Sequence, residues 1–284
     1  MADQHELIEQ MGPIHTNRTV ESFRRFARVP VSQLQDLSQK ALSENWGSES
    51  FALLHYIAVQ TRWSIEQGRY SSDGDRLYVA AGNLKTRYGT PIYLIYVPNQ
   101  HPQFGGGTPP WALVDVCTEL YGVDPPVPPE IPTPPPVDLQ LEVVLQHEHI
   151  LGGNEDRVSF LAQTPPVAQM CAVAGAVQWS LFRLLQLPYW YCGRMNYLVP
   201  LYLTSRENIT LAPDLVAPIE VQAGQLLVRT VMVPHWPYAR ARVAVNRHDQ
   251  LPPWMLNAWN AEAERMEQET IDDPEGRESG CTPG

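Results

Sequence analysis

The stretch RLYVAAGNLKTRYGTPIYLIYV, residues Arg76–Val97, decides the fold class of this chain. It contains two apolar runs, Leu77–Ala81 and Ile92–Val97, which are rich in β-branched and aromatic residues. Turn-forming residues, among them Gly89 and Pro91, separate the two runs. Apolar runs bounded by such residues are typical of β-strands. The stretch therefore predicts two neighbouring strands.

Further strand-like runs occur on the C-terminal side of this stretch. They are Trp111–Cys117, Asp138–Ile150, Leu198–Thr204, Leu215–Val221, Gln225–Val233 and Arg240–Val245. Their number and their scattering among helical segments favour an α+β fold, in which a mainly antiparallel sheet is packed by at least three helices.

Helical patterns lie on both sides of the strand pair. Between Val31 and Gln67, leucines and other apolar residues recur every three to four positions, and Asn45–Ser48 interrupts the pattern, so we expect two helices. A third helix is predicted from about Val167 to Leu187, because Pro165 and Pro166 suit the first turn of a helix. Polar residues inside this last helix favour a core position over a membrane span.

Proline divides the chain. Eight of the twelve residues from Pro125 to Pro136 are prolines, which indicates an extended, semi-rigid connector. We therefore expect an N-terminal part of helices and strands over 1–124, a connector over 125–136, a C-terminal α+β part carrying the site over 137–260, and an acidic tail over 261–284.

The charge of the chain bears on its partners. The net charge is −11, and eight acids against two arginines between Glu262 and Glu278 supply about half of it. An acidic protein is a poor general binder of nucleic acid, so a polyanionic partner needs a local basic patch. Of the 20 basic residues only Lys40 and Lys85 are lysines. Arginine is suited to bidentate contacts with phosphate or carboxylate, although surface arginine also explains this bias.

Several classes of protein are disfavoured by what the sequence lacks. Its four cysteines show neither a disulfide framework nor zinc-ligand spacing, and the N-terminus lacks the features of a signal peptide. We therefore expect a cytoplasmic protein without a membrane anchor. The phosphate-binding loop, dinucleotide, hydrolase-elbow, zinc-protease and kinase motifs do not occur, so we expect no cofactor and no metal.

The densest polar cluster is HEHILGGNEDR, residues 147–157. If the segment is extended, His147 and His149 share one face, but a third metal ligand is not spaced nearby. We predict that one of these two histidines is a general base, whose imidazole Glu148 or Asp156 could orient. A hydrogen-bonded structural histidine, and a salt-bridged turn at Asp156, are the alternatives.

Two other clusters are candidates for binding. The aromatic run from Tyr189 to Tyr197 could line a pocket, although such runs more often fill cores. Within the expected strand at Arg240–Val245, Arg240 and Arg242 would point the same way and form a stripe for phosphate. Arg229 and Arg247 extend the basic set. A solvated face paired with the acidic tail is the alternative.

The chain also resembles a known but uncharacterised family. The residues that carry the resemblance are Asn45-Trp46, Phe51–Ile57, Pro91–Tyr93, Pro98-Asn99, Glu148–Leu151, Asn154, Asp156-Arg157, Leu198–Leu201 and Tyr238–Arg242. Their order is similar to a domain family of bacteria and fungi that sits beside RNA-associated modules in larger proteins. The resemblance covers most of Val31–Met255. It departs from the family at Ala239-Arg240, where two asparagines are expected.

In its general character, a short chain with an acidic tail, the protein also resembles the fungal arginine-containing cyclodipeptide synthases. This resemblance implies aminoacyl-tRNA as the substrate and amide formation without ATP, metal or redox cofactor. For that reaction His149, oriented by Glu148 or Asp156, would be the base that frees the attacking amine. The resemblance also implies substrate binding by Asn154, Glu155, Arg157, Tyr197 and Tyr238, with Glu148, Glu155 and Asp156 as carboxylates for an arginyl side chain. The arginines at 229, 240, 242 and 247 would then contact RNA phosphates.

Two other functions remain open on the sequence. One is hydrolysis of RNA or a nucleotide with His149 as general base. The other is a non-catalytic RNA-binding module. The sequence leaves the oligomeric state and the identity of the amino acids open.

Overall fold

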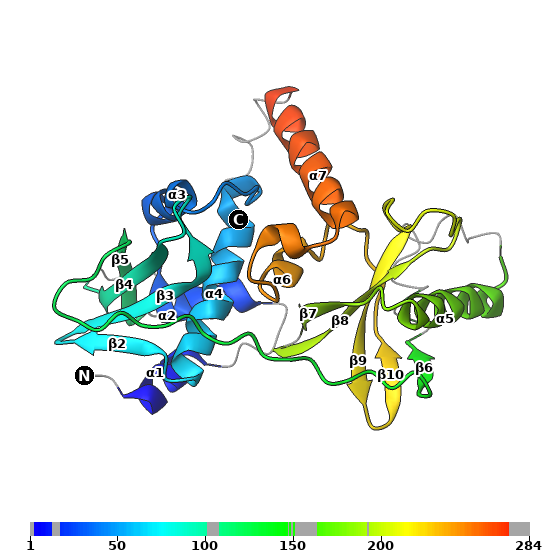
Figure 1. Ribbon diagram of the computed structural model, residues 1–284, viewed down its shortest axis with the longest axis horizontal. Coiled ribbons are helices and arrows are strands. Elements are labelled where there is room, and N and C mark those ends of the chain that lie inside the picture. Colours follow the sequence, from blue (N-terminus) through cyan, green and yellow to red (C-terminus); the bar gives the residue numbers. More distant parts are fainter. Residues whose placement is uncertain are drawn as a thin grey trace, which may run out of the picture.

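The fold is known from a computed structural model. It describes residues 3–12, 18–100, 108–146, 148, 150, 164–191 and 193–272, with side chains described as far as residue 265. Figure 1 shows two sheets at opposite ends of the molecule, with helix α6 between them and helix α7 extending away from the body.

The first sheet has the strand order β1-β5-β4-β3-β2. Its strands are β1 (Ala27–Arg28), β2 (Tyr70–Asp73), β3 (Arg76–Lys85), β4 (Pro91–Pro98) and β5 (Trp111–Cys117). Three of the pairings are antiparallel, and the short β1 lies parallel to β5. The strand pair predicted within Arg76–Val97 is thus confirmed as β3 and β4, whose connecting turn holds Gly89 at φ +79°.

Four helices lie in the same part of the molecule as this sheet. They are α1 (Gln4–Met11), α2 (Thr19–Phe26), α3 (Val31–Lys40) and α4 (Phe51–Glu66). The two helices expected between Val31 and Gln67 are confirmed as α3 and α4, and a short 3₁₀ turn, η1 (Ser48–Ser50), leads into α4. Helix α4 is buried along nearly its whole length and contacts β3, α1, α2 and α6. It is therefore the central element of the larger core.

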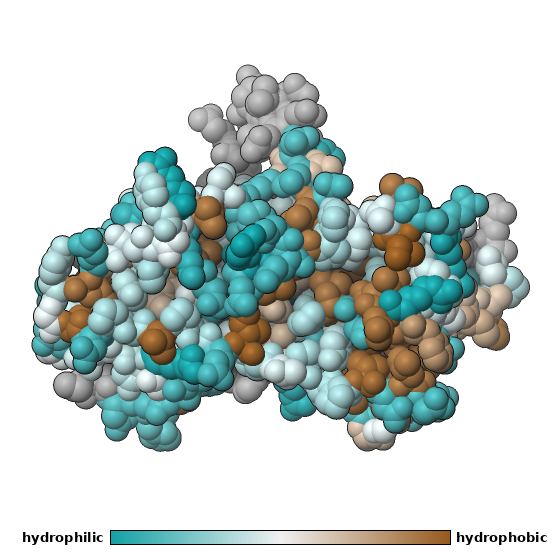
Figure 2. All heavy atoms as spheres, in the orientation of Figure 1, coloured by the Kyte–Doolittle hydropathy of each residue, from teal (hydrophilic) through white to brown (hydrophobic). Residues whose placement is uncertain are grey.

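The second sheet has the order β6-β10-β9-β8-β7. Its strands are β6 (Glu142–Leu145), β7 (Leu187–Tyr191), β8 (Arg194–Leu201), β9 (Leu215–Gln222) and β10 (Gln225–Val228). Only the β6–β10 pairing is parallel. Helix α5 (Pro166–Phe182) packs on β8 and β6 and forms a separate apolar core with this sheet. Figure 2 shows that hydrophobic side chains gather on the side of this second sheet.

The expected α+β class is confirmed, with two mixed sheets in place of one. The strand expected over Asp138–Ile150 is shorter, because the chain turns after Leu145 and the Ile150 N–H donates to the Gln146 carbonyl at 3.0 Å. The third helix ends at Phe182, where Leu184 takes the left-handed conformation at φ +54°. Within the described residues, no helix combines the length and the apolar character that crossing a membrane requires.

The strand expected over Arg240–Val245 is wrong. Residues Tyr238–Arg242 form the short helix α6, and the 3₁₀ turn η4 (His248–Gln250) and helix α7 (Pro253–Asp272) follow. The alternation of arginine and alanine fits a strand, but both residues are also good helix formers. Packing against α4 and β7 selects the helix.

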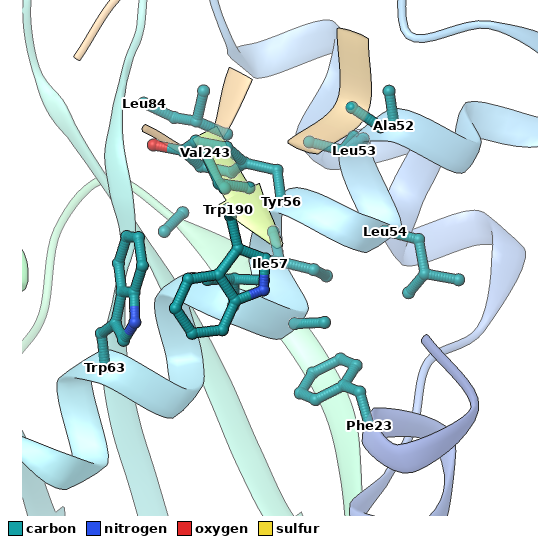
Figure 3. Packing of buried hydrophobic residues seen from close by; sticks show 14 of the residues in the cluster. Phe23, Ala52, Leu53, Leu54, Tyr56, Ile57, Trp63, Leu84, Trp190 and Val243 are labelled. Atoms are coloured by element: carbon teal, nitrogen blue, oxygen red, sulfur yellow. The ribbon is translucent and has the colours of Figure 1, made fainter. Parts of the chain in front are cut away.

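The C-terminal elements complete the N-terminal core. Residues of α6 and the start of α7, including Tyr238, Ala241 and Met255, belong to the same buried cluster as α4. Trp190 of β7 also enters this cluster, where its ring lies edge-on to that of Trp63, 5.2 Å between centroids (Figure 3). The first core is therefore built from both sides of the proline-rich segment.

Candidate functional site

The polar turn favoured by the sequence lies mostly outside the described residues. This applies to His147, His149, Asn154, Glu155, Asp156 and Arg157. Of its neighbours, Glu148 is exposed and Ile150 is fully buried in the second core. The role of His149 as general base, with Glu148 or Asp156 beside it, therefore stays a prediction.

The four arginines predicted to contact RNA phosphates do not form one stripe. Arg229 donates to Glu220 at 2.7 Å, and Arg247 pairs with Asp249. Arg240 lies over the ring of Tyr191, with its guanidinium carbon 5.6 Å from the ring centroid.

Arg242 is only 2% exposed and pairs with Glu44, so it is not placed to contact RNA. The stripe was wrong because α6 is a helix, which turns residues 240 and 242 to different sides.

The two tyrosines predicted to bind substrate have different surroundings. Tyr238 is fully buried, donates to Glu44 at 2.7 Å and stacks on Trp259 with 4.5 Å between ring centroids. Tyr197 on β8 is half-buried and packs against the second core. Tyr238 therefore supports the fold around α6 and is not exposed to a ligand.

The structure instead brings other polar and aromatic residues together in a cavity of about 600 Å³, which we call the α6 cavity. It lies among α2, α4, β7, α6 and α7, and its lining includes His55, Tyr189, Trp236, Arg240, Trp259 and Glu262.

Helical spacing explains why these side chains share one space. Phe51 and His55 are four residues apart on α4, and Trp259 and Glu262 are three apart on α7. Residues with these spacings lie on the same face of a helix. On α2, Glu21 and Arg24 follow the same rule.

The lining of the α6 cavity includes both exposed aromatic rings and buried side chains. Phe51 and Trp236 line it with 53% and 51% of their surfaces exposed. Its buried lining includes His55, at 5% exposure, and the fully buried Tyr189. Exposed aromatic rings are suited to stacking on a flat group of a ligand.

Positive charge exceeds negative charge in the described lining, which holds three arginines and two glutamates. The Nε of Arg18 lies 3.6 Å from Glu21, and Arg265, outside the lining, donates to Glu262 at 3.0 Å. This hydrogen bond to Arg265 holds the pKa of Glu262 below its usual range. Arg24 is exposed and makes no ion pair with any residue the structure describes.

His55 is the most unusual group in the lining. Burial lowers the pKa of its imidazole to about 3, the positive charge of Arg240 adds to the effect, and a hydrogen bond with the Ala239 backbone opposes it. The ring is therefore neutral at neutral pH. Its Nδ1 is buried and has no hydrogen-bond partner among the described residues.

A buried polar network lies on the other side of α6. Arg242 Nε and the Tyr238 hydroxyl both donate to Glu44 Oε1 at 2.7 Å. The guanidinium also lies over the ring of Tyr56, 4.7 Å from its centroid. Burial opposes the charge of Arg242, but the neighbouring Tyr56 and Glu44 outweigh it and raise the pKa of Arg242. A second cavity of about 730 Å³ borders this network at Glu44, Lys85 and His248.

Among the residues of the α6 cavity, the sequence predicted a binding role only for Arg240 and, as part of the aromatic run, for Tyr189; it gave none to His55. The available signal was a histidine within the apolar run FALLHYIAVQ, one helical turn after Phe51. Within the described residues, the structure holds no group of three or more histidine, cysteine, aspartate or glutamate side chains arranged to bind a metal.

Comparisons with known proteins do not add a family. No family model, no curated protein and no solved structure matches this chain.

Proposed function

We propose that the protein is an enzyme that binds the nucleotide end of an RNA-borne substrate in the α6 cavity. The reaction we propose is aminoacyl-tRNA-dependent formation of a cyclodipeptide that contains arginine. The observation that carries the proposal is the composition of this cavity, which combines arginines, exposed aromatic rings and a buried neutral imidazole.

The lining suits a nucleotide in two ways. Arg18, Arg24 and Arg240 supply guanidinium groups, which bind phosphate through charge-assisted hydrogen bonds. Phe51 and Trp236 supply exposed rings on which a base can stack. This local excess of positive charge supports binding of a polyanion by a chain whose net charge is −11.

The volume is also appropriate. Small-molecule sites in proteins measure roughly 300–1,000 Å³. The α6 cavity, at about 600 Å³, falls within this range and has room for one nucleotide with a small attached group.

The reaction itself consists of two aminoacyl transfers. In each, an amine nitrogen attacks the carbonyl carbon of an aminoacyl ester, the C–N bond forms, and the ribose oxygen leaves and takes up the proton that the amine loses. Such a step needs a base for the amine and donors for the developing oxyanion. His149 remains our proposed base, whereas His55 is a weak base because its pKa is about 3.

The test is to express the chain in a host and to analyse the small molecules by mass spectrometry. We expect a cyclodipeptide from the wild-type chain and a strong loss in a variant that combines Arg24→Gln with Phe51→Ala. Arg87→Gln with Tyr88→Ala is the matched control, because this exposed arginine and aromatic ring lie in the turn between β3 and β4, outside the cavity lining.

Three other results would redirect or overturn the proposal. Shortened RNA without a dipeptide would identify a hydrolase. RNA binding without a product would identify a binding module. An equal product yield from the cavity variant and the control would remove the α6 cavity from the function.

A further inference from the structure

We infer that the second cavity, which borders the network of Glu44 and Arg242, is a separate binding site that takes a small sugar phosphate. We call it the Lys85 cavity. Its volume of about 730 Å³ lies in the range of small-molecule sites, roughly 300–1,000 Å³. It shares no lining residue with the α6 cavity, so the inference goes beyond the proposed function and does not depend on it.

Segments that are distant in the sequence build the Lys85 cavity. Residues 42–44 precede α4, residues 83–85 belong to β3, and residues 242 and 246–249 lie at the end of α6 and beyond it. The Leu42 N–H donates to the Lys85 carbonyl at 2.9 Å. The Gln250 side chain accepts from the N–H groups of Asn246 and Arg247 at 3.0 and 3.2 Å. These bonds hold the walls in place before a ligand arrives, which lowers the cost of binding.

The charges of the lining leave one cation in excess. Arg242 pairs with Glu44, and Arg247 pairs with Asp249. Lys85 is exposed and makes no ion pair with any residue that the structure describes. Because each carboxylate of the lining already has its own arginine, neither opposes a negative ligand at Lys85. The lining therefore favours an anion.

Neutral polar side chains lie in the same lining as this lysine. They belong to Ser43, Asn83 and Asn246, and no described residue forms a hydrogen bond with any of these three side chains. A ligand can reach them, since Ser43 and Asn246 are exposed and Asn83 is only partly buried. Hydroxyl and amide groups both donate and accept hydrogen bonds. They are therefore suited to a ligand that carries several oxygen atoms.

The state of the cations favours phosphate over carboxylate. A carboxylate binds best to the planar fork of a guanidinium. Both arginines of the lining have turned this fork to an acid, Arg242 through Nε to Glu44 and Arg247 through Nε and Nη2 to Asp249. Lys85 remains as a point charge, the form in which lysine commonly binds phosphate. Phosphate oxygens point in several directions, so partners on different segments can each bind one.

The remaining lining is suited to a sugar. Leu42 is 44% exposed and offers an apolar surface to the C–H groups of a sugar ring. Ser43 follows it in the sequence, and Asn83 lines the cavity from β3, so donors and acceptors for hydroxyl groups accompany the apolar surface. An apolar wall with a few polar groups is the usual composition of a small-molecule site.

The inference can be tested by calorimetry of the full chain with ribose 5-phosphate, inorganic phosphate and ribose. We expect ribose 5-phosphate to bind most tightly, inorganic phosphate more weakly, and ribose without measurable affinity. Lys85→Gln should weaken the binding of ribose 5-phosphate about tenfold, the effect of one lost hydrogen bond to a charged group. Lys85→Arg keeps the charge and should lose less.

Arg87→Gln is the matched control. It removes one positive charge two positions farther along the chain, from an exposed side chain outside the lining, so it should bind ribose 5-phosphate like the wild-type chain. An equal loss in Arg87→Gln and Lys85→Gln would reduce the effect to the net charge and overturn the site. Far-ultraviolet circular dichroism of each variant verifies that it is folded.

A further variant shows which cavity the ligand occupies. Arg24→Gln combined with Phe51→Ala alters the lining of the α6 cavity and should leave the binding of ribose 5-phosphate unchanged. If this variant lost the binding and Lys85→Gln kept it, the ligand would occupy the α6 cavity and the inference would be wrong.

The other outcomes also decide the inference without affecting the proposed function. No binding of ribose 5-phosphate, or equal binding of ribose, would overturn a phosphate site. Tighter binding of gluconate, a carboxylate with similar hydroxyl groups, would overturn phosphate as the ligand class. The formation of a cyclodipeptide is tested at the α6 cavity and is independent of these results.

Discussion

Arg242 and Glu44 form an ion pair at 2.7 Å, with side chains that are 2% and 3% exposed. The pair connects the N-terminal and the C-terminal segments that together build the larger core. Glu44 lies before α4 and Arg242 ends α6. The pair fixes α6 against α4, and α6 contributes Ala239 and Arg240 to the α6 cavity. The geometry of the cavity therefore depends on a bond outside its lining.

Breaking this pair from one side should be strongly destabilising. Arg242→Met leaves the Glu44 carboxylate buried without its cation, and we expect a loss of about 3–5 kcal/mol in the free energy of unfolding. Urea unfolding followed by tryptophan fluorescence measures it. The double variant Glu44→Leu with Arg242→Met should lose less, because no buried charge is left unpaired. A double variant less stable than Arg242→Met would contradict this account.

The exposed pair of Arg247 and Asp249 provides a control for the same experiment. Both side chains are largely in solvent, and surface ion pairs contribute little. Arg247→Ala should leave the midpoint of urea unfolding unchanged. A shift as large as that of Arg242→Met would show that burial is not the deciding factor.

Gly47 should not tolerate a side chain. It has φ +71°, and a Cβ at this position would lie 2.6 Å from Cζ2 of Trp259. Gly47→Ala must displace the indole that stacks on Tyr238, and overpacking of this kind costs roughly 1–3 kcal/mol. Gly89→Ala, at φ +79° with no atom within 4 Å, isolates the backbone strain. Equal losses for the two variants would exclude the contact with Trp259.

Salt should reveal the contribution of Arg24 to RNA binding. If this arginine contacts one phosphate, Arg24→Gln should weaken binding and lower the slope of log K against log salt by about 0.7, the value for one contact with single-stranded nucleic acid. Fluorescence anisotropy with a labelled RNA oligonucleotide, from low to high salt, gives the slope. Arg87→Gln should leave the slope unchanged, and a slope that Arg24→Gln does not alter removes Arg24 from the interface.

His55 should make stability depend on pH in a defined window. Its pKa is about 3 in the folded chain and about 6.5 when exposed, so between these values the unfolded chain holds one proton more. Stability contributed by the neutral ring is complete above pH 6.5 and falls with decreasing pH, by about 1.4 kcal/mol per pH unit. Urea unfolding at pH 4.5 and 7 should show a shallower dependence for His55→Asn. Identical dependences would contradict a neutral buried imidazole.

The local sequence pattern was sufficient to predict much of the fold. The runs at Ile92–Val97 and Trp111–Cys117 are apolar over most of their length and bounded by turn formers, and they form β4 and β5. The helix from Pro166 was visible in its prolines and its apolar length. The structure of such a segment can be predicted from its own sequence pattern, because it depends on the burial of one continuous stretch.

Elements decided by distant contacts were not predictable. Five residues of alternating arginine and alanine fit a strand or a helix, and α6 is a helix because Glu44 and Tyr56 receive Arg242. The α6 cavity has the same origin, since five separate elements supply its lining. His55 could be recognised only after the fold had placed Arg240 and Ala239 beside it.

The bond between Glu44 and Arg242 spans 198 positions of the chain. While the ribosome synthesises the second sheet, the emerging polypeptide already contains the acid but not the base that neutralises it. The N-terminal half cannot reach its final state early, and a product truncated before Arg242 would present an unpaired carboxylate at an open hydrophobic surface. A chain cut before Arg242 should therefore be less stable than one that contains this arginine.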